Sequence, residues 1–152
     1  MSTVCIDSKH IERVQTFKLL DIHISNDLSW DVHVEYMLKK VAKRMYCIHC
    51  LIRIGADASD IISVYCSIIR SILDYACPVW HPGLTKCQHK TIEWVQKRFI
   101  KILYPFLSYS EGLTLSGLER LYDRRERLTK EMFNEIKNQN HGFTIFYLLD
   151  LK

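Results

Sequence analysis

Apolar residues recur every three or four positions along residues 30–53, and this spacing predicts an amphipathic helix. The apolar face consists of Val34, Met37, Leu38, Val41, Met45, Ile48 and Ile52. Ser29 or Asp31 stands where a helix cap is expected, and Gly55 stands where a helix is expected to end.

A second helix is predicted over residues 58–76, with Asp57 or Ser59 capping its start. Its apolar positions cover most of the circumference and are Ile61, Ile62, Val64, Tyr65, Ile68, Ile69, Ile72 and Leu73. A helix that is apolar nearly all round is buried centrally, although the isoleucines leave a strand open for part of the segment. Pro78 is expected to end this helix before a rigid loop at 77–83.

The same period predicts helices at 85–104 and at about 122–138. The inward face of the first consists of Ile92, Val95, Phe99, Ile102 and Leu103. Pro105 is expected to stop that helix, and a loop at 105–113 and a short turn at 115–121 follow it. Asn138, Asn140 and Gly142 are expected to end the last helix.

The N-terminal part predicts β-structure. One short apolar strand is expected from Phe17, Leu19, Ile22 and Ile24. A turn at Asn26 and Asp27 follows it, and Ile11, Val14 and Phe17 suggest the first arm of a hairpin with residues 17–24. The expected fold is therefore mainly α, with a short N-terminal β-hairpin at 1–29 and a compact bundle of about four helices at 30–140. An apolar tail at 141–152 completes the chain.

Length and composition are those of one folded domain, with 152 residues of which 48% are hydrophobic. The six cysteines follow an N-terminus without a hydrophobic signal segment, so free thiols and an intracellular location are expected. No apolar run reaches the roughly 18 residues of a membrane span, so no membrane contact is expected. The net charge of +4 permits binding to polyanions without requiring it.

Two groups of basic residues are candidate binding sites. The first, on the helix at 30–53 near Tyr36, consists of Lys39, Lys40, Lys43 and Arg44. Helical spacing makes these cations neighbours, and they form either a phosphate-binding patch or an ordinary solvated face.

The second basic group lies on the helix at 85–104 and consists of Lys90, Trp94, Lys97, Arg98 and Lys101. An aromatic ring among cations can stack a base while the cations hold phosphate. Alternatively, Trp94 packs in a groove of the fold with the lysine stems around it.

Metal and catalytic chemistry find little support in the sequence. Cys47-x-x-Cys50 with His49, and Cys87-x-His89 after His81, have ligand types that zinc accepts. A structural zinc site takes paired ligands from a tight turn, whereas Cys47 and Cys50 lie within a predicted helix and suit small core positions. The chain has no Asp-Asp pair, glycine-rich phosphate loop or nucleophile motif, so neither catalysis nor a cofactor is expected.

Four blocks of residues resemble, in order, the region after the catalytic palm of reverse transcriptases from non-LTR (LINE-type) retrotransposons. The first, like the primer grip and thumb entry, consists of Phe17, Lys18, Leu20, Ile22, Leu28, Ser29, Trp30 and His33. The second consists of Tyr65, Ile69, Ser71, Ile72, Leu73, Tyr75, Val79 and Trp80. The third consists of Ile92, Val95, Gln96, Lys97, Arg98, Lys101, Ile102 and Leu103, and the fourth of Leu118, Leu121, Arg124, Arg125 and Glu126.

This resemblance covers roughly residues 11–140 and implies a thumb and connection that lie against a template–primer backbone. The family's paired catalytic aspartates precede this region, so the resemblance implies a non-catalytic fragment. Lys18 and residues 17–24 would then lie where the primer terminus does. Where the family has a glycine the chain has Asp21, which argues against a tight turn there.

Residues 11–55 also resemble the N-terminal region of AlkB homologue eight, which is associated with a 2-oxoglutarate and iron dioxygenase and with tRNA modification. That chemistry needs two histidines and one carboxylate on a β-scaffold. His10-Ile11-Glu12 is the one forward motif of this kind, and the strand-rich frame is missing, so oxygenase activity is not expected.

Three functional hypotheses follow from the sequence. The chain is a non-catalytic reverse transcriptase fragment that contacts RNA or DNA backbone, a helical interaction module, or a relic without function. The interaction module would bind a protein partner or a second copy through the apolar segment 143–149.

Overall fold

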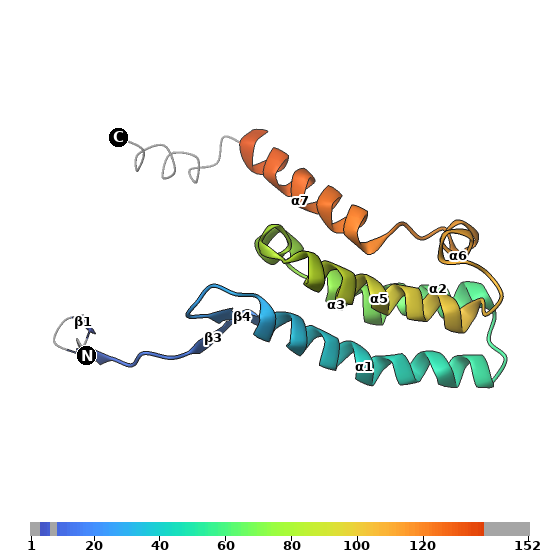
Figure 1. The fold of residues 1–152 in the computed structure, drawn as a ribbon, viewed down its shortest axis with the longest axis horizontal. Helices are drawn as coiled ribbons and strands as arrows, with labels where there is room; N and C mark the ends of the chain where they lie inside the picture. The colour runs from blue at the N-terminus through green and yellow to red at the C-terminus, as the bar shows by residue number, and fades with distance from the viewer. Residues whose placement is uncertain (1–3, 7–8, 139–152) are drawn as a thin grey trace.

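The computed structural model describes residues 4–6 and 9–138 and is mainly helical, as predicted (Figure 1). Two antiparallel strand pairs come first: β1 (Val4–Ile6) with β2 (Lys9–Ile11), and β3 (Thr16–Leu19) with β4 (Ile22–Ser25). The helices are α1 (Asp31–Arg53), α2 (Ala58–Tyr65), the π-helical turn η1 (Cys66–Arg70), α3 (Ser71–Asp74), α4 (Cys77–Trp80), the 3-10 turn η2 (His81–Gly83), α5 (Lys86–Leu103), α6 (Tyr109–Ser116) and α7 (Leu121–Asn138). The tail 141–152 lies outside the described residues.

The β3–β4 hairpin corrects the prediction of one apolar strand between Phe17 and Ile24. The register pairs Phe17 with Ile24 and Leu19 with Ile22, which leaves a two-residue turn. Leu20 and Asp21 form this turn with φ angles of 46° and 67°. Tight hairpin turns need positive φ at both central residues, and aspartate tolerates that conformation. The expectation that Asp21 argues against a tight turn is therefore wrong.

Helix α1 has the extent that its apolar period predicts. It ends as expected, because Gly55 has φ +76° and the backbone N–H of Ala56 donates to the carbonyl of Leu51 at 3.1 Å. The predicted caps are wrong, since the helix starts after Trp30 without a side-chain cap. Asp31 Oδ1 instead accepts a hydrogen bond from Gln88 Nε2 of α5 at 2.7 Å.

The chain is helical throughout residues 58–74, so the alternative of a strand in this segment is wrong. Burial is confined to one face rather than surrounding the helix, with Ile61, Tyr65, Ile69 and Leu73 buried and their apolar neighbours half-buried. The predicted loop at 77–83 is also wrong, because α4 and η2 occupy it. Pro78 lies in the first turn of α4, where the missing N–H needs no partner.

By length and composition alone, Ala58–Gly83 is the one helical stretch in the described chain that qualifies as a membrane span, with a mean hydropathy of 1.3. The expectation that no run reaches that length is wrong in this respect. The stretch bends after Asp74, where Tyr75 has ψ 122° and Ala76 has φ 49°.

The core lies between α1, the α2–α3 run and α5, and α4 packs on α7 (Figure 1). Tyr65 stacks on Phe99 with ring centroids 3.9 Å apart, and both side chains are fully buried. Helix α6 corrects the predicted loop at 105–113. It crosses α5 so closely that a Cβ on Gly112 would lie 2.3 Å from Ile100 Cγ2.

Candidate nucleic-acid interface

The basic residues of α1 separate into two groups in the structure. Lys39 and Lys43 are exposed on the solvent side, where Lys39 Nζ lies 2.6 Å from Glu35 Oε1. Lys40 and Arg44 instead interact with neighbouring elements. Arg44 Nη1 donates to the carbonyl of Ile68 at 3.1 Å, which attaches α1 to η1. Of the four cations predicted to form one patch, Lys39 and Lys43 therefore lie on the solvent side, whereas Lys40 and Arg44 contact other elements of the fold.

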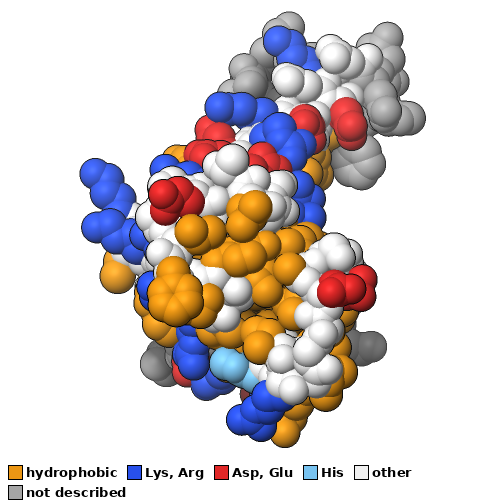
Figure 2. Space-filling model, turned by 90° about the vertical axis from the view of Figure 1, so that its right-hand side faces the viewer, with side chains coloured by type: hydrophobic (Ala, Val, Ile, Leu, Met, Phe, Trp, Pro, Cys, Tyr) orange, Lys and Arg blue, Asp and Glu red, His pale blue; other side chains and the backbone are white. Residues whose placement is uncertain are grey.

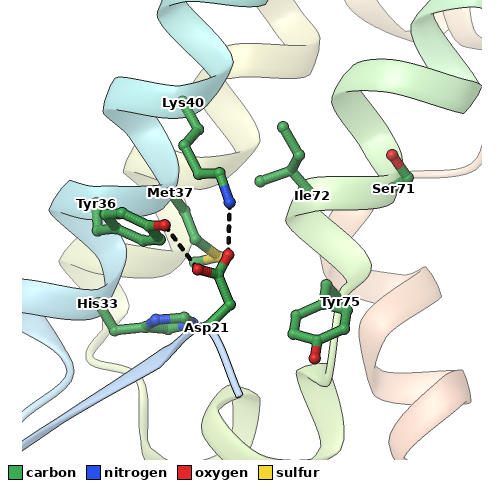
Figure 3. A pocket seen from close by; sticks show the side chains of 8 residues that line it. All are labelled: Asp21, His33, Tyr36, Met37, Lys40, Ser71, Ile72 and Tyr75. Carbon is green, nitrogen blue, oxygen red and sulfur yellow. Dashed lines mark hydrogen bonds and ion pairs between the residues drawn. The ribbon is translucent and has the colours of Figure 1, made fainter. Parts of the chain in front are cut away.

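Asp21 pairs with two cations, Lys18 and Lys40, and Figure 3 shows its contacts with Lys40 and Tyr36. Its Oδ1 accepts from Tyr36 OH at 2.7 Å and lies 2.7 Å from Lys18 Nζ, while Oδ2 lies 2.5 Å from Lys40 Nζ. These hydrogen bonds, led by the one from Lys18, hold the pKa of the Asp21 carboxyl well below its usual range. Lys18 and Lys40 consequently have a carboxylate partner before any phosphate approaches.

Asp21 and its partners Lys18, Tyr36 and Lys40 are here called the Asp21 cluster. This cluster borders a cavity of about 290 Å³ between the hairpin turn, α1 and α3 (Figure 3). Tyr75 OH donates to the carbonyl of Leu20 at 3.0 Å and fastens the turn from the other side. These contacts attach the β3–β4 hairpin to the helices. The cluster therefore has a positioning role for the β3–β4 hairpin.

Asp21→Asn is expected to loosen the hairpin without unfolding the helices. The amide cannot balance two lysines, so backbone hydrogen exchange should speed up in β3 and β4 and stay unchanged in α1. Because the cluster is partly exposed, global stability should fall by about 1 kcal/mol at most. Asp27→Asn is the matched control, since Asp27 accepts from the Ser29 N–H and touches no lysine. Unchanged exchange in the hairpin would refute the positioning role of Asp21.

The basic residues of α5 lie at a hollow of about 530 Å³ between α5 and α6, here called the α5–α6 hollow. Its lining includes four of the predicted residues: Trp94, Lys97, Arg98 and Lys101. The Arg98 guanidinium lies over the Trp94 ring at 5.4 Å, and Lys97 Nζ over the Tyr109 ring at 5.4 Å. Lys90 lines a different, smaller hollow with Glu93, and Lys97 borders that hollow as well.

A second hollow of about 470 Å³ lies between α1 and α5 and shares Trp94 and Arg98 with the first. This α1–α5 groove has Tyr46 on its α1 wall, and Tyr46 is 65% exposed. Trp94 is 55% exposed and lines this groove with the Arg98 guanidinium over its ring, a placement that leaves both interpretations of the sequence, groove packing and base stacking, open. Neither hollow has an aspartate or glutamate among its described lining residues.

Tyr46 is a site residue that the sequence analysis did not single out, and His49 was considered there only as a zinc ligand. Both lie on the groove wall of α1, and Tyr46 is exposed three residues after Lys43. Residues three and four apart are neighbours on a helix. The helical spacing from Lys43 was therefore the signal that could have identified Tyr46.

The cysteines and histidines do not assemble a metal site within the described residues, where no group of three or more potential ligands occurs. Cys47 is exposed and Cys50 half-buried, so the expectation that they fill core positions is wrong. Of the motif His10-Ile11-Glu12, His10 and Ile11 lie in β2 and Glu12 is exposed. The described surface offers cations and aromatic rings, which can bind phosphates and bases.

Comparisons with known proteins identify no relative: no family model, curated protein or solved structure matches the chain.

Proposed function

We propose that this protein is a non-catalytic nucleic-acid-binding module, similar to the thumb and connection of a LINE-type reverse transcriptase. It binds RNA or DNA through the phosphate backbone and without sequence preference. The observation that carries the proposal is the pair of adjoining hollows on α5, which are bordered by exposed cations and lined by no described carboxylate. Lys97, Arg98 and Lys101 supply the charge at the hollow, with Lys43 on α1 and with Lys39, whose Nζ also pairs with the exposed Glu35.

The residues that carry the resemblance include packing residues and exposed cations, together with exposed apolar residues such as Leu20 and Leu28. Trp80, from the second block, lies 5.6 Å from the His33 ring of the first and 5.7 Å from the guanidinium of Arg125 of the fourth. These side chains pack against one another, so their role in this fold is structural. Lys97, Arg98 and Lys101 of the third block are exposed instead, and their contacts are on the surface, with the Tyr109 ring, the Trp94 ring and the Pro105 carbonyl respectively.

The test is a salt titration of binding to mixed-sequence 20-nucleotide RNA and DNA, single-stranded and duplex. Affinity should fall linearly on a log–log scale as salt rises, because each phosphate contact releases counterions. The triple variant Lys97→Gln, Arg98→Gln, Lys101→Gln should bind at least tenfold more weakly and with a shallower salt slope. Salt-independent binding, or none, would refute the proposal.

A matched control removes the same charge elsewhere. Arg13, Lys86 and Lys137 are exposed and line none of the hollows described above. Their triple replacement by glutamine should lower affinity only slightly, through net charge. Equal losses in both triple variants would show that binding depends on overall charge rather than on the α5 surface. Transfer RNA as a competitor tests the alternative drawn from the AlkB-homologue resemblance.

A helical protein-interaction module is the second candidate. Figure 2 shows hydrophobic side chains gathered at the end of the molecule where α6 lies, with lysine and arginine side chains around them. Near this end Ile54, Phe106 and Leu115 are exposed by 77%, 98% and 62%. Association that salt does not weaken, and that Phe106→Ser removes, would favour this function. The predicted contact segment 143–149 lies outside the described residues.

A further inference from the structure

The walls of the α1–α5 groove carry two exposed aromatic rings on different helices. Tyr46 projects from α1 and Trp94 from α5, and both line the same hollow of about 470 Å³. The groove floor includes the apolar side chains of Val41, Met45 and Val95, which are almost fully buried. An apolar floor between aromatic walls suits a flat, weakly hydrated ligand, and Arg98 is the one lysine or arginine among the described lining residues of this groove.

Cations lie at one end of this groove. Trp94 and Arg98 belong to both hollows, so the aromatic wall adjoins the α5–α6 hollow where Lys97 and Lys101 lie. The Arg98 guanidinium already lies over the Trp94 ring at 5.4 Å, which holds the indole near the boundary. A ligand that extends across this boundary meets an aromatic surface and then a group of cations.

We propose that the α1–α5 groove stacks the unpaired bases of a single nucleic-acid strand while the α5–α6 hollow holds the phosphates of the same strand. This inference rests on the proposed function and adds the preference for single strands. In a duplex the base faces stack on one another, so Tyr46 and Trp94 would have no face to contact. Stacking tolerates any sequence because every base has a flat π-face.

Charge complementarity favours a nucleic acid over a protein in this groove. An apolar groove between helices also accepts an amphipathic helix. However, Arg98 lies over the Trp94 ring, Lys43 precedes Tyr46 by three residues on α1, and no described lining residue of the groove is acidic. A polyanion with flat apolar bases satisfies both features, whereas most helices would bring cations of their own.

The experiment compares binding of an unstructured 12-nucleotide oligo(U) and a 12-base-pair duplex at one salt concentration. Trp94→Ala should weaken oligo(U) binding about tenfold, which corresponds to about 1.4 kcal/mol and lies in the range for one stacked base. Tyr46→Ala should act in the same direction, and Trp94→Phe should restore most of the affinity. Duplex binding should not change in any of these variants.

The matched control is Phe133→Ala on α7, because Phe133 is 58% exposed, close to the 55% of Trp94. A second readout is tryptophan fluorescence, which oligo(U) should quench through Trp94, since Trp80 is fully buried and Trp30 is partly buried. Circular dichroism of each variant verifies that the helices are retained.

Each outcome distinguishes the two proposals. If oligo(U) and duplex bind equally and Trp94→Ala changes neither, the stacking site is refuted while the backbone-binding function stands. If the unsubstituted protein binds neither probe at any salt concentration, both are refuted. If Trp94→Ala lowers both affinities equally, the indole only supports the cationic surface. Self-association in sedimentation that Trp94→Ala abolishes would make the groove a protein interface and refute the stacking site.

Discussion

Replacing Gln96 by leucine is expected to lower the free energy of unfolding by about 3 kcal/mol or more. The amide is fully buried, and its Oε1 accepts from Tyr65 OH at 3.0 Å. Its Nε2 donates to Tyr109 OH at 3.2 Å and to the carbonyl of Glu119 at 2.8 Å. Leucine removes these bonds and leaves buried polar groups without partners, each at a cost of about 1–3 kcal/mol.

Urea denaturation followed by circular dichroism measures this loss. Combining Gln96→Leu with Tyr65→Phe should cost less than the sum of the single variants, because the second change removes an unpaired hydroxyl. Gln15→Leu is the control, since Gln15 is exposed and bonds only to Asn26. A loss below about 1 kcal/mol for Gln96→Leu would contradict the network as described.

This network also explains how the candidate interface is held in place. Glu93 Oε2 accepts the backbone N–H of Tyr122 at 3.0 Å, while Oε1 accepts from Tyr109 OH, whose ring lies beneath Lys97. Burial and this carboxylate raise the pKa of the Tyr109 phenol, which keeps the hydroxyl protonated as a donor. The start of α6 and the start of α7 are thus fixed to α5, beside the exposed cations.

The long helices were predictable because each buries one face. The period of three and four identified α1, α5 and α7 within one or two residues at most boundaries. Helix α6 was missed because Gly112 and the neighbouring serines resemble a loop. The missed signal was the capping box, in which Ser108 and Glu111 bond reciprocally to backbone N–H groups.

The hairpin turn was missed for a different reason. The apolar positions 17, 19, 22 and 24 change phase across Leu20 and Asp21, but a phase change without glycine or asparagine is a weak local sign of a two-residue turn. The turn is stabilised from outside, by Tyr36 and Lys40 of α1 and by Tyr75. Contacts between residues so distant in sequence have no local signature.

The candidate site was predictable on α5 and only partly on α1. Spacing alone placed Trp94, Lys97, Arg98 and Lys101 together, and the structure has all of them in one hollow. The same reasoning grouped Lys40 with Lys39, because it could not foresee that the hairpin brings Asp21 to Lys40. Tertiary packing determines which cations remain exposed. The helical spacing of the sequence carries no information about that packing.

Acid is expected to destabilise the protein between pH 6.5 and about 4, before most carboxylates titrate. His33 and His81 are almost fully buried, and burial is the main cause that lowers the pKa of each from 6.5 to about 4. The neighbouring charges on His33 are His23, Asp21 and Lys40, and those on His81 are Arg125, His89 and Glu126. Both rings are therefore neutral in the folded protein at pH 5.

The sign follows from proton uptake. Below pH 6.5 the unfolded chain binds protons on these histidines and the folded chain does not, so stability is complete above 6.5 and falls as the pH approaches 4. For each histidine, the free energy of unfolding lost over this pH range is on the order of 3 kcal/mol at most. Protonation also removes the acceptor role of His33 Nδ1 for the His23 N–H, at 3.4 Å, and of His81 Nδ1 for Arg125 Nε, at 3.4 Å.

Urea denaturation at pH 7.5, 5.5 and 4.5 should therefore give a steadily falling free energy of unfolding. His81→Gln should flatten this dependence while lowering stability at pH 7.5, because the amide does not titrate. His49→Gln is the control, since His49 lies half-buried in the groove with no buried cation against it. A free energy that stays constant down to pH 4.5 would show that neither buried ring resists protonation. A fall that appears only below pH 4 would show that carboxylates cause the acid sensitivity. Asp21 is one such carboxylate, because its pKa is lowered and its contribution to stability is lost only below pH 4.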